Sequence, residues 1–232
     1  MLIKVLDLET TGMPPDAAVC EVGWCNVLGD EFGWNVHSPI AMIVNPGRPM
    51  PAEAQAVHHI SDQDCEGAPQ ATEAYRMLMD GAEVFVAHNA AFEREFFAGG
   101  DRPWICTFKC ARRAWPDLPS FGNQFLRYQR RLVLDHATAM PPHRAGPDAY
   151  VTAHILVDLL KEQNVETLID WTRMPVHYPR VPMTHAKGKL WSEIDSGLLS
   201  WFLKQDHVDS DIKAAARTEI KRRDGERSRG RF

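Results

Sequence analysis

The first 45 residues contain short apolar runs separated by turn residues, a pattern typical of β-strands. Residues 2–8 (LIKVLDL) suit a buried central strand, and a Thr-Thr-Gly sequence followed by two prolines ends it. Residues 18–29 and 34–45 are predicted to be the next two strands, with Gly29-Asp30 in the connecting turn. The pattern therefore predicts a three-stranded meander at the start of the chain.

Helical spacing dominates the middle of the chain. Residues 70–81 place their apolar side chains on one helical face, and residues 146–163 form a longer amphipathic segment. Two short apolar runs, 83–87 and 104–106, are predicted to be strands. Further helices are predicted at 51–60, 90–97, 107–115 and 121–129. A meander followed by strands that alternate with helices predicts an α/β domain with a mixed five-stranded sheet flanked by helices.

A second, smaller part is predicted at the end of the chain. Two prolines interrupt the helical spacing between residues 164 and 181, so we predict a first domain at 1–171 and a linker at 172–182. Residues 183–223 carry two tryptophans and a final helical pattern, which predicts a small C-terminal module. Residues 224–232 are predicted to be a basic, flexible tail.

Charge is distributed unevenly along the sequence. The formal net charge is −5 over 232 residues. Seven basic and three acidic residues between 217 and 232 give that end +4, which leaves −9 for the remainder. The basic end is predicted to be either an arm that binds phosphate or a solvated terminus. The acidity elsewhere suits carboxylates that hold cations.

Composition narrows the class of protein. A hydrophobic fraction of 44% and a charged fraction of 25% are ordinary for a soluble globular protein. The sequence has no apolar run long enough to predict a membrane span, and its N-terminus does not resemble an export signal. Five cysteines without a CxxC pair are predicted to be free thiols in a reducing compartment. We therefore expect a cytoplasmic protein without a membrane partner.

Three groups of acidic and histidine residues lie where predicted strands end or helices begin. Asp7 and Glu9 are two residues apart on a strand, so both carboxylates face the same side. The other groups are HNAAFE at 88–93 and HRAGPD at 143–148. Each group alone is common on a solvated surface. All three together, in this order and on these elements, favour one shared site.

Such a set suits divalent cations and phosphodiester hydrolysis. Mg²⁺ prefers several oxygen ligands and keeps water and phosphate among them. Two such ions about 4 Å apart can clamp the attacking and leaving oxygens of a phosphodiester. This arrangement requires several carboxylates and a base whose pKa lies near 7, for which histidine is the natural candidate.

The motifs LDLETTG, VAHNAAFE and HRAGPDA together resemble the DnaQ-like 3′→5′ exonucleases with the DEDDh signature, which share a ribonuclease-H-like fold. The resemblance covers nearly the whole chain, including an A-x-x-x-H-x-I element in AQAVHHI. Within the family it is strongest to the exonuclease X group, whose small C-terminal module is similar to HAKGKLWSEI and LLSWFLK here.

The resemblance implies a role for each motif. Two Mg²⁺ ions, which Mn²⁺ can replace, would be held by four carboxylates, with the first of them bridging both ions: Asp7, Glu9, Glu93 and Asp148. His143 would be the general base. The groove for the 3′-terminal nucleotide would be formed by Thr10, Thr11, His88, Asn89 and Phe92. Met13 is predicted either to wedge beneath the terminal base or to lie partly buried in a turn.

One motif residue departs from the family pattern. The second motif usually has aspartate where this chain has Glu93. The family ligand at this position reaches its metal through a water molecule. Loss or displacement of that water would make room for the additional methylene group of glutamate. Three functions stay open: an exonuclease releasing 5′-mononucleotides from DNA, an RNA-trimming enzyme of the RNase T or oligoribonuclease kind, and a non-catalytic protein that binds nucleic-acid ends. We favour the first, with single-stranded or 3′-ended nucleic acid as its partner and DNA favoured over RNA. Monomer and dimer both stay open.

Overall fold

The structure, a computed structural model, describes residues 1–176 and 178–229, with side chains as far as Glu226. The chain divides into two compact units, the first comprising Met1–Thr172 and the second beginning at Arg173. Each unit has a hydrophobic core of its own. His177 in the predicted linker and residues 230–232 in the predicted tail lie outside the described residues.

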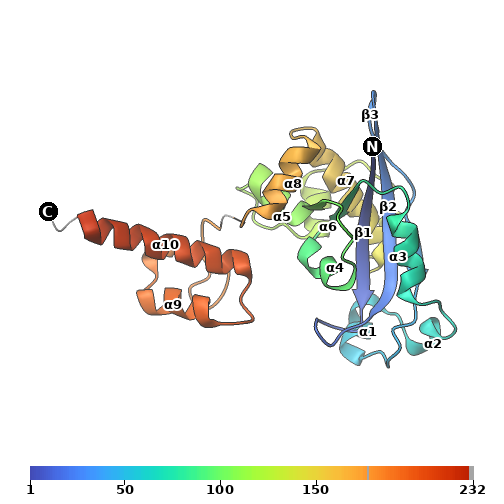
Figure 1. Ribbon diagram of the computed structural model, residues 1–232, viewed down its shortest axis with the longest axis horizontal. Helices are drawn as coiled ribbons and strands as arrows, with labels where there is room; N and C mark the ends of the chain where they lie inside the picture. Colours follow the sequence, from blue (N-terminus) through green and yellow to red (C-terminus); the bar gives the residue numbers. More distant parts are fainter. Residues whose placement is uncertain (177, 230–232) are drawn as a thin grey trace. The chain divides into compact units, whose positions relative to one another are not determined.

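A mixed sheet of six strands forms the centre of the first unit. The strands are β1 (Leu2–Thr10), β2 (Val19–Asp30), β3 (Gly33–Val36), β4 (Ile40–Ile43), β5 (Val84–Ala87) and β6 (Trp104–Cys106). Their order is β3-β2-β1-β5-β6, and β4 also pairs with β2. β1 runs antiparallel to β2 and parallel to β5. The predicted α/β class with a mixed sheet is confirmed (Figure 1).

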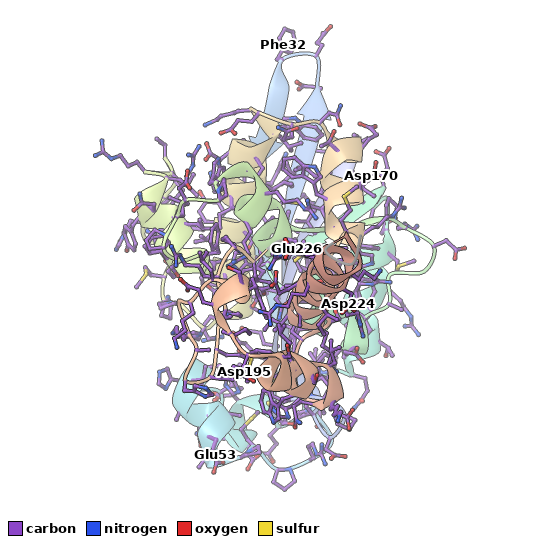
Figure 2. The ribbon with its side chains drawn as sticks, turned by 90° about the vertical axis from the view of Figure 1, so that its left-hand side faces the viewer. Phe32, Glu53, Asp170, Asp195, Asp224 and Glu226 are labelled. Atoms are coloured by element: carbon purple, nitrogen blue, oxygen red, sulfur yellow. The ribbon has the colours of Figure 1, made fainter. Side chains whose placement is uncertain are left out.

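The sheet has one strand more than the five predicted from the sequence. Residues 34–45 do not form one strand, because Pro39 lies between β3 and β4 and has no N–H to donate to β2. β3 pairs with residues 27–30 and β4 with residues 21–24, so both lie along the same long partner. The β2–β3 hairpin projects from the unit and ends at Phe32, which is 89% exposed (Figure 2).

Helices cover both faces of the sheet. They are α1 (Ala52–His58), α2 (Asp62–Cys65), α3 (Ala71–Met79), α4 (Ala90–Phe96), α5 (Thr107–Ala114), α6 (Asn123–Gln129), α7 (Ala145–Leu160) and α8 (Val165–Arg173). Figure 1 shows α3 on one side of β1 and β2, and α7 on the other, where it packs against both strands. Among the described residues, no helix combines the length and the apolar character needed to cross a lipid bilayer.

The alternation of β1 decides which of its side chains face α7. Ile3 and Val5 belong to the core cluster that includes α7, whereas Leu6 belongs to the cluster that includes α3. Asp7 and Glu9 continue the series that begins with Ile3, since side chains two apart on a strand point to the same face. Both carboxylates are therefore carried to the face on which α7 lies.

Gly23 of β2 lets the first turn of α7 approach the sheet closely. It lies opposite Asp7 in the register of β1 and β2. A Cβ atom at this position would lie 2.1 Å from the carbonyl carbon of Ala145. Any larger residue would push the start of α7 away from the sheet. Because Asp148 is in that first turn, Gly23 also allows Asp148 to lie beside Asp7.

The second unit is a small helical module. It contains η1 (Trp191–Glu193), α9 (Ser196–Lys204) and α10 (Ser210–Arg229). Its core includes Val176, Tyr178 and Val181, which pack with the apolar side chains of α9 and α10. Three residues of the segment predicted to be a linker, 172–182, are thus buried in the module.

α10 continues to Arg229, whereas the sequence predicts a flexible tail from residue 224. A charge pair one turn apart crosses the predicted boundary, since Arg222 donates to Glu226 at 2.6 Å. Glu219 also accepts from both Arg222 and Arg223. Arg223 also donates to the backbone oxygen of Ile194 at 2.7 Å, which joins α10 to the segment before α9. Two of the basic residues near the end of the chain are therefore part of the helix's own framework.

Candidate active site

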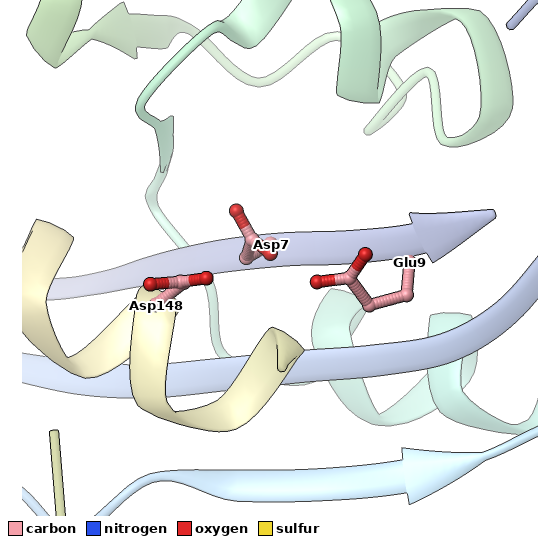
Figure 3. A group of neighbouring side chains, drawn as sticks. All are labelled: Asp7, Glu9 and Asp148. Atoms are coloured by element: carbon pink, nitrogen blue, oxygen red, sulfur yellow. The ribbon is translucent and has the colours of Figure 1, made fainter. Parts of the chain in front are cut away.

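Three carboxylates converge where β1 meets the start of α7. Asp7 and Glu9 come from β1, and Asp148 comes from the first turn of α7. One oxygen of each carboxylate lies within 4.8 Å of those of the other two. Figure 3 shows Glu9 and Asp148 extending toward Asp7 from opposite sides. The alternation of β1 and the close approach at Gly23 bring together residues that lie far apart in the sequence.

Glu93 reaches the same region from a different element. It lies in the first turn of α4, directly after β5, and is 4% exposed. Its Oε2 atom has no hydrogen-bond partner among the described residues. An unpartnered buried carboxylate oxygen is costly in an empty site and is suited to a ligand that offers positive charge. Glu93 is not one of the three converging residues, but it lines a cavity with two of them.

This cavity has a volume of about 350 Å³ and combines carboxylates with amide, imidazole and aromatic groups. Its lining residues are Asp7, His88, Asn89, Glu93, Gly122, Asn123, Gln124, Phe125, Pro142, His143 and Asp148. Four of the five residues predicted to be catalytic therefore share one cavity. The fifth, Glu9, does not line the cavity but lies close to Asp7 and Asp148, which do.

Burial and mutual repulsion oppose the ionisation of these carboxylates. Burial raises the pKa of Glu9 to about 8, and the charge of Asp148 adds to the rise. Burial also raises the pKa of Glu93 to about 8, with a contribution from Glu9. The pKa of Asp7 lies well above its ordinary value, first through burial and then through Asp148. A divalent cation would supply the missing positive charge, so the donor set fits a hard metal ion.

His143 lines the cavity from the loop that precedes α7. Its φ angle is 60°, in the left-handed region that is uncommon for residues other than glycine. Its backbone N–H donates to Oδ2 of Asp148 at 2.7 Å. The carboxylate of Asp148 therefore also helps to hold the loop in this conformation.

Asn123 and Gln124 lie in the cavity although the sequence patterns do not single them out. The side-chain amide of Gln124 donates to Oδ1 of Asp148 at 3.3 Å. The amide of Asn123 donates to the backbone oxygen of Asp148 at 3.2 Å and to the hydroxyl of Thr152 at 2.7 Å. The only signal in the sequence is a pair of amides at the start of a predicted helix, a feature that is common on protein surfaces.

Two of the six residues predicted to hold the terminal nucleotide, His88 and Asn89, line the cavity. Nε2 of His88 donates to the carbonyl oxygen of Phe121 at 2.8 Å, which leaves Nδ1 to accept from the hydroxyl of Thr107 at 2.9 Å. Burial lowers the pKa of His88 to about 4. The ring is therefore neutral at physiological pH and contributes shape rather than charge.

The other four residues of that prediction are absent from the cavity lining: Thr10, Thr11, Met13 and Phe92. Thr10 and Thr11 are buried, and their hydroxyl groups bond within the loop after β1. Thr10 donates to the backbone oxygen of Gly12 at 2.7 Å, and Thr11 accepts from the N–H of Ala18 at 3.0 Å. Met13 is 73% exposed. The structure gives the two threonines a part in shaping the loop, and contact of all four with substrate stays a prediction.

A sequence model of the exonuclease family (RNase_T) matches residues 5–156, a range that includes all five residues predicted to be catalytic. The chain belongs to this exonuclease family. The enzyme class predicted from the sequence, a DnaQ-like 3′→5′ exonuclease, is confirmed.

Relatives of this exonuclease include exodeoxyribonuclease 10 of Escherichia coli (strain K12), which is 29% identical over 214 residues, covering 90% of this chain and 93% of the relative. A DNA polymerase III subunit epsilon-like protein of Rhodobacter capsulatus is 40% identical over 102 residues, covering 40% of this chain and 13% of the relative.

Solved structures of similar fold include exonuclease X in complex with 5′ overhanging duplex DNA, with a TM-score of 0.64 and 30% identity. That similarity covers 73% of this chain and 99% of the other. The nuclease domain of 3′hExo, a DEDDh family member bound to rAMP, has a TM-score of 0.57 and 14% identity, covering 69% and 92% of the two chains. The ribonuclease-H-like fold is thereby confirmed. The exonuclease X structure leaves about a quarter of this exonuclease without a counterpart.

Proposed function

We propose that this exonuclease hydrolyses DNA from a free 3′ end and releases 5′-mononucleotides. The observation that carries the proposal is the convergence of Asp7, Glu9 and Asp148 beside a cavity that also contains Glu93 and His143. Several buried carboxylates this close together are suited to bind divalent cations, and a neighbouring imidazole is suited to proton transfer.

Two divalent cations, Mg²⁺ or Mn²⁺ in its place, would be held by Asp7, Glu9, Glu93 and Asp148. When bound, these ions supply stabilisation of the charge that develops on the phosphate and on the leaving oxygen. The raised pKa values of Glu9 and Glu93 and the unpartnered oxygen of Glu93 support this assignment. Asp7 lies between the other two converging carboxylates (Figure 3), so it would contribute to holding both ions.

His143 is proposed to act as the general base by accepting a proton from the attacking water at its imidazole. It lines the same cavity as Asp7 and Asp148, and its backbone bond to Asp148 ties its loop to the carboxylate cluster. The carboxylates are less suited to this role, because each of them is required as a ligand for positive charge.

The 3′-terminal nucleotide is proposed to occupy the cavity between His88, Asn89 and residues 122–125. Phe125 offers an apolar surface there, and the neutral ring of His88 adds no charge that would compete with the cations for phosphate. Met13 is exposed on the loop directly after β1, where it is suited to wedge beneath the terminal base. The remaining flanking residues of this proposal are Thr10, Thr11 and Phe92.

DNA is favoured over RNA because of two relatives that each match most of this chain. One is named an exodeoxyribonuclease, and the other was solved with 5′ overhanging duplex DNA. An RNA-trimming exonuclease is the second candidate, since the 3′hExo domain bound to rAMP has the same fold. A cytoplasmic location is proposed because the five cysteines are all free and buried, which suits a reducing compartment.

The second unit is proposed to bind the phosphate backbone. It holds 13 of the 26 basic residues but eight of the 31 acidic ones, so it carries +5 and the first unit −10. On α10, a basic face is formed at one-turn intervals by Lys213, Arg217 and Lys221. These three side chains make no ion pair with any described residue, unlike Arg222 and Arg223. A basic face without internal partners suits the phosphates of a nucleic acid.

Digestion of labelled substrates tests the proposed function. Single-stranded DNA, a duplex with a 5′ overhang and RNA of the same sequence are incubated with Mg²⁺ and with either the natural protein or Asp7→Asn. We expect mononucleotides from DNA with the natural protein, none with Asp7→Asn, and a loss of Mn²⁺ binding by calorimetry in that variant. Faster cleavage of RNA would favour the RNA-trimming enzyme. Binding without product on every substrate would indicate an end-binding protein, and unchanged Mn²⁺ affinity would contradict the role of Asp7.

A further inference from the structure

A fifth carboxylate, Glu21 of β2, lies buried next to the cluster but has a different set of partners. Its Oε2 accepts from Nε of Arg144 at 3.0 Å and from the backbone N–H of Ala145 at 2.9 Å. Its Oε1 accepts from Nη2 of Arg144 at 2.6 Å. Two parallel bonds between a guanidinium and a carboxylate give a strong contact of defined geometry. Glu21 is therefore already neutralised and is not available as a further metal ligand.

The position of this pair connects the carboxylate strand with the loop of the proposed base. Glu21 lies opposite Glu9 in the register of β1 and β2. Arg144 directly follows His143 and is the N-cap residue of α7, immediately before Ala145. The contact spans 123 residues of sequence. It therefore attaches the start of α7 to the strand that flanks Asp7 and Glu9.

The loop at His143 is thus held by two carboxylates, one on each side of the histidine. Asp148 accepts from the backbone N–H of His143, and Glu21 accepts from Arg144 and Ala145. The backbone of His143 is left-handed, a conformation that persists in a non-glycine residue when its surroundings impose it. If the contact with Glu21 were lost, the loop would be free to relax toward ordinary backbone angles, which would move the imidazole.

The charge of Arg144 has a second consequence. Glu21 raises the pKa of both Asp7 and Glu9, and Arg144 offsets part of this by lowering the pKa of Glu9. Without Arg144, Glu21 would be one more unpaired buried negative charge beside these two residues. The pair therefore allows a hydrogen-bonding anchor to lie next to a carboxylate cluster without adding net charge to it.

We propose that Glu21 and Arg144 are positioning residues that set the location of the His143 imidazole relative to Asp7 and Asp148. The inference rests on the proposed role of His143 as general base. The competing explanation is that the ion pair stabilises the fold and has no specific effect on the base. The two explanations differ in what happens when the imidazole is absent.

Arg144→Lys keeps the positive charge and loses the double contact. Glu21→Gln keeps one acceptor oxygen, replaces the other with an NH2 group that cannot accept, and loses the negative charge. Each is made in the natural protein and in His143→Ala, and kcat and KM are measured on a single-stranded DNA with saturating Mg²⁺. We expect kcat to fall about 10- to 100-fold with KM changed by less than about twofold, the effect of a misplaced catalytic group. In the His143→Ala background the same substitutions should lower kcat by less than about twofold, because no base remains to be misplaced.

The matched control is Asp158→Asn at the other end of α7. Asp158 is also buried and accepts from Arg130 at 2.8 Å and from Lys161 at 3.1 Å. This variant should lower the melting temperature and leave kcat unchanged. An equal fall of kcat for Arg144→Lys in both backgrounds would overturn the inference, since the pair would then act through the fold or the cations.

Amide hydrogen exchange separates failure of the inference from failure of the proposed function. Exchange at His143 and Ala145 should speed up at least about tenfold in Arg144→Lys and stay unchanged in Asp158→Asn, whether or not the protein turns over DNA. Unchanged exchange in Arg144→Lys would overturn the positioning role directly. If instead His143→Ala retains the natural rate, the general base is wrong and the positioning role falls with it.

Discussion

Glu93→Gln replaces a buried carboxyl group with an amide of nearly the same size. In the folded, metal-free protein, burial raises the pKa of Glu93 from 4.5 to about 8. The folded chain therefore holds this proton more tightly than the unfolded chain does. The stability that the protonated group contributes is complete below pH 4.5 and is lost as the pH rises toward 8. Glutamine has no proton to lose, so the variant should escape this loss.

The size of the effect follows from the same pKa values. Each pH unit above 4.5 removes about 1.4 kcal/mol until the pH nears 8, so the loss at pH 7 is roughly 3 kcal/mol. For a unit of this size, 1 kcal/mol corresponds to about 2–4 °C in melting temperature. Glu93→Gln should therefore melt roughly 6–12 °C above the natural protein at pH 7 in EDTA, and at nearly the same temperature at pH 4.5.

Differential scanning calorimetry of the full chain in EDTA between pH 4.5 and 8.5 measures this difference. Glu95→Gln is the control, because Glu95 is exposed on the same helix and its replacement should leave the melting temperature unchanged. Mg²⁺ should stabilise the natural protein more than Glu93→Gln, and Glu93→Gln should lose exonuclease activity because an amide is a weaker ligand for a cation.

Two results would refute this reasoning. One is a melting temperature of the natural protein in EDTA that does not fall between pH 5 and pH 8. The other is a Glu93→Gln variant that melts no higher than the natural protein at pH 7 while Glu95→Gln behaves as expected. Either result would mean that the Glu93 carboxylate is not destabilised by its surroundings in the absence of metal.

Gly23→Ala should destabilise the first unit by about 1–3 kcal/mol and reduce activity, because the new Cβ would lie 2.1 Å from the backbone of Ala145. Urea unfolding measures the change in stability, and the control is Gly225→Ala, whose new Cβ would meet no atom within 4 Å. Replacing Lys213, Arg217 and Lys221 with glutamate should weaken the binding of single-stranded DNA in fluorescence anisotropy. It should also make the plot of the logarithm of the association constant against the logarithm of salt concentration less steep by about 2, whereas Arg76→Glu on α3 should change neither. The ring of His88, whose pKa is about 4, should show no NMR titration between pH 6 and 9; a midpoint in that range would contradict its bonds to Phe121 and Thr107.

Much of the sheet could be predicted because strand patterns are local. The alternation in LIKVLDLET places Asp7 and Glu9 on one face of β1 whatever packs against it, since successive side chains on a strand point to opposite sides. The break at Pro39 was harder to predict, because apolar residues on both sides of it favour one continuous strand. Both pieces pair with β2, and the length of β2 decides that there is room for each.

The second unit shows the limit of reasoning from local composition. Pro175 and Pro179 favour a linker, yet the apolar residues beside them, Val176 and Tyr178, are buried in the core of the module. Their burial depends on partners that come later in the chain, such as the ring of Trp191, whose indole N–H donates to the backbone oxygen of Tyr178. No pattern within the segment itself indicates such partners.

The sequence by itself determined the family, the order of its motifs and the shared face of Asp7 and Glu9, because these depend on residue identity and on the geometry of a single strand. Tertiary structure alone decided the close approach of α7 at Gly23, the contact of Gln124 with Asp148, and the pairing of Glu21 with Arg144 across 123 residues. These contacts between distant segments depend on how helix α7 packs on the sheet. The energy of that packing comes from many side chains and not from any one motif.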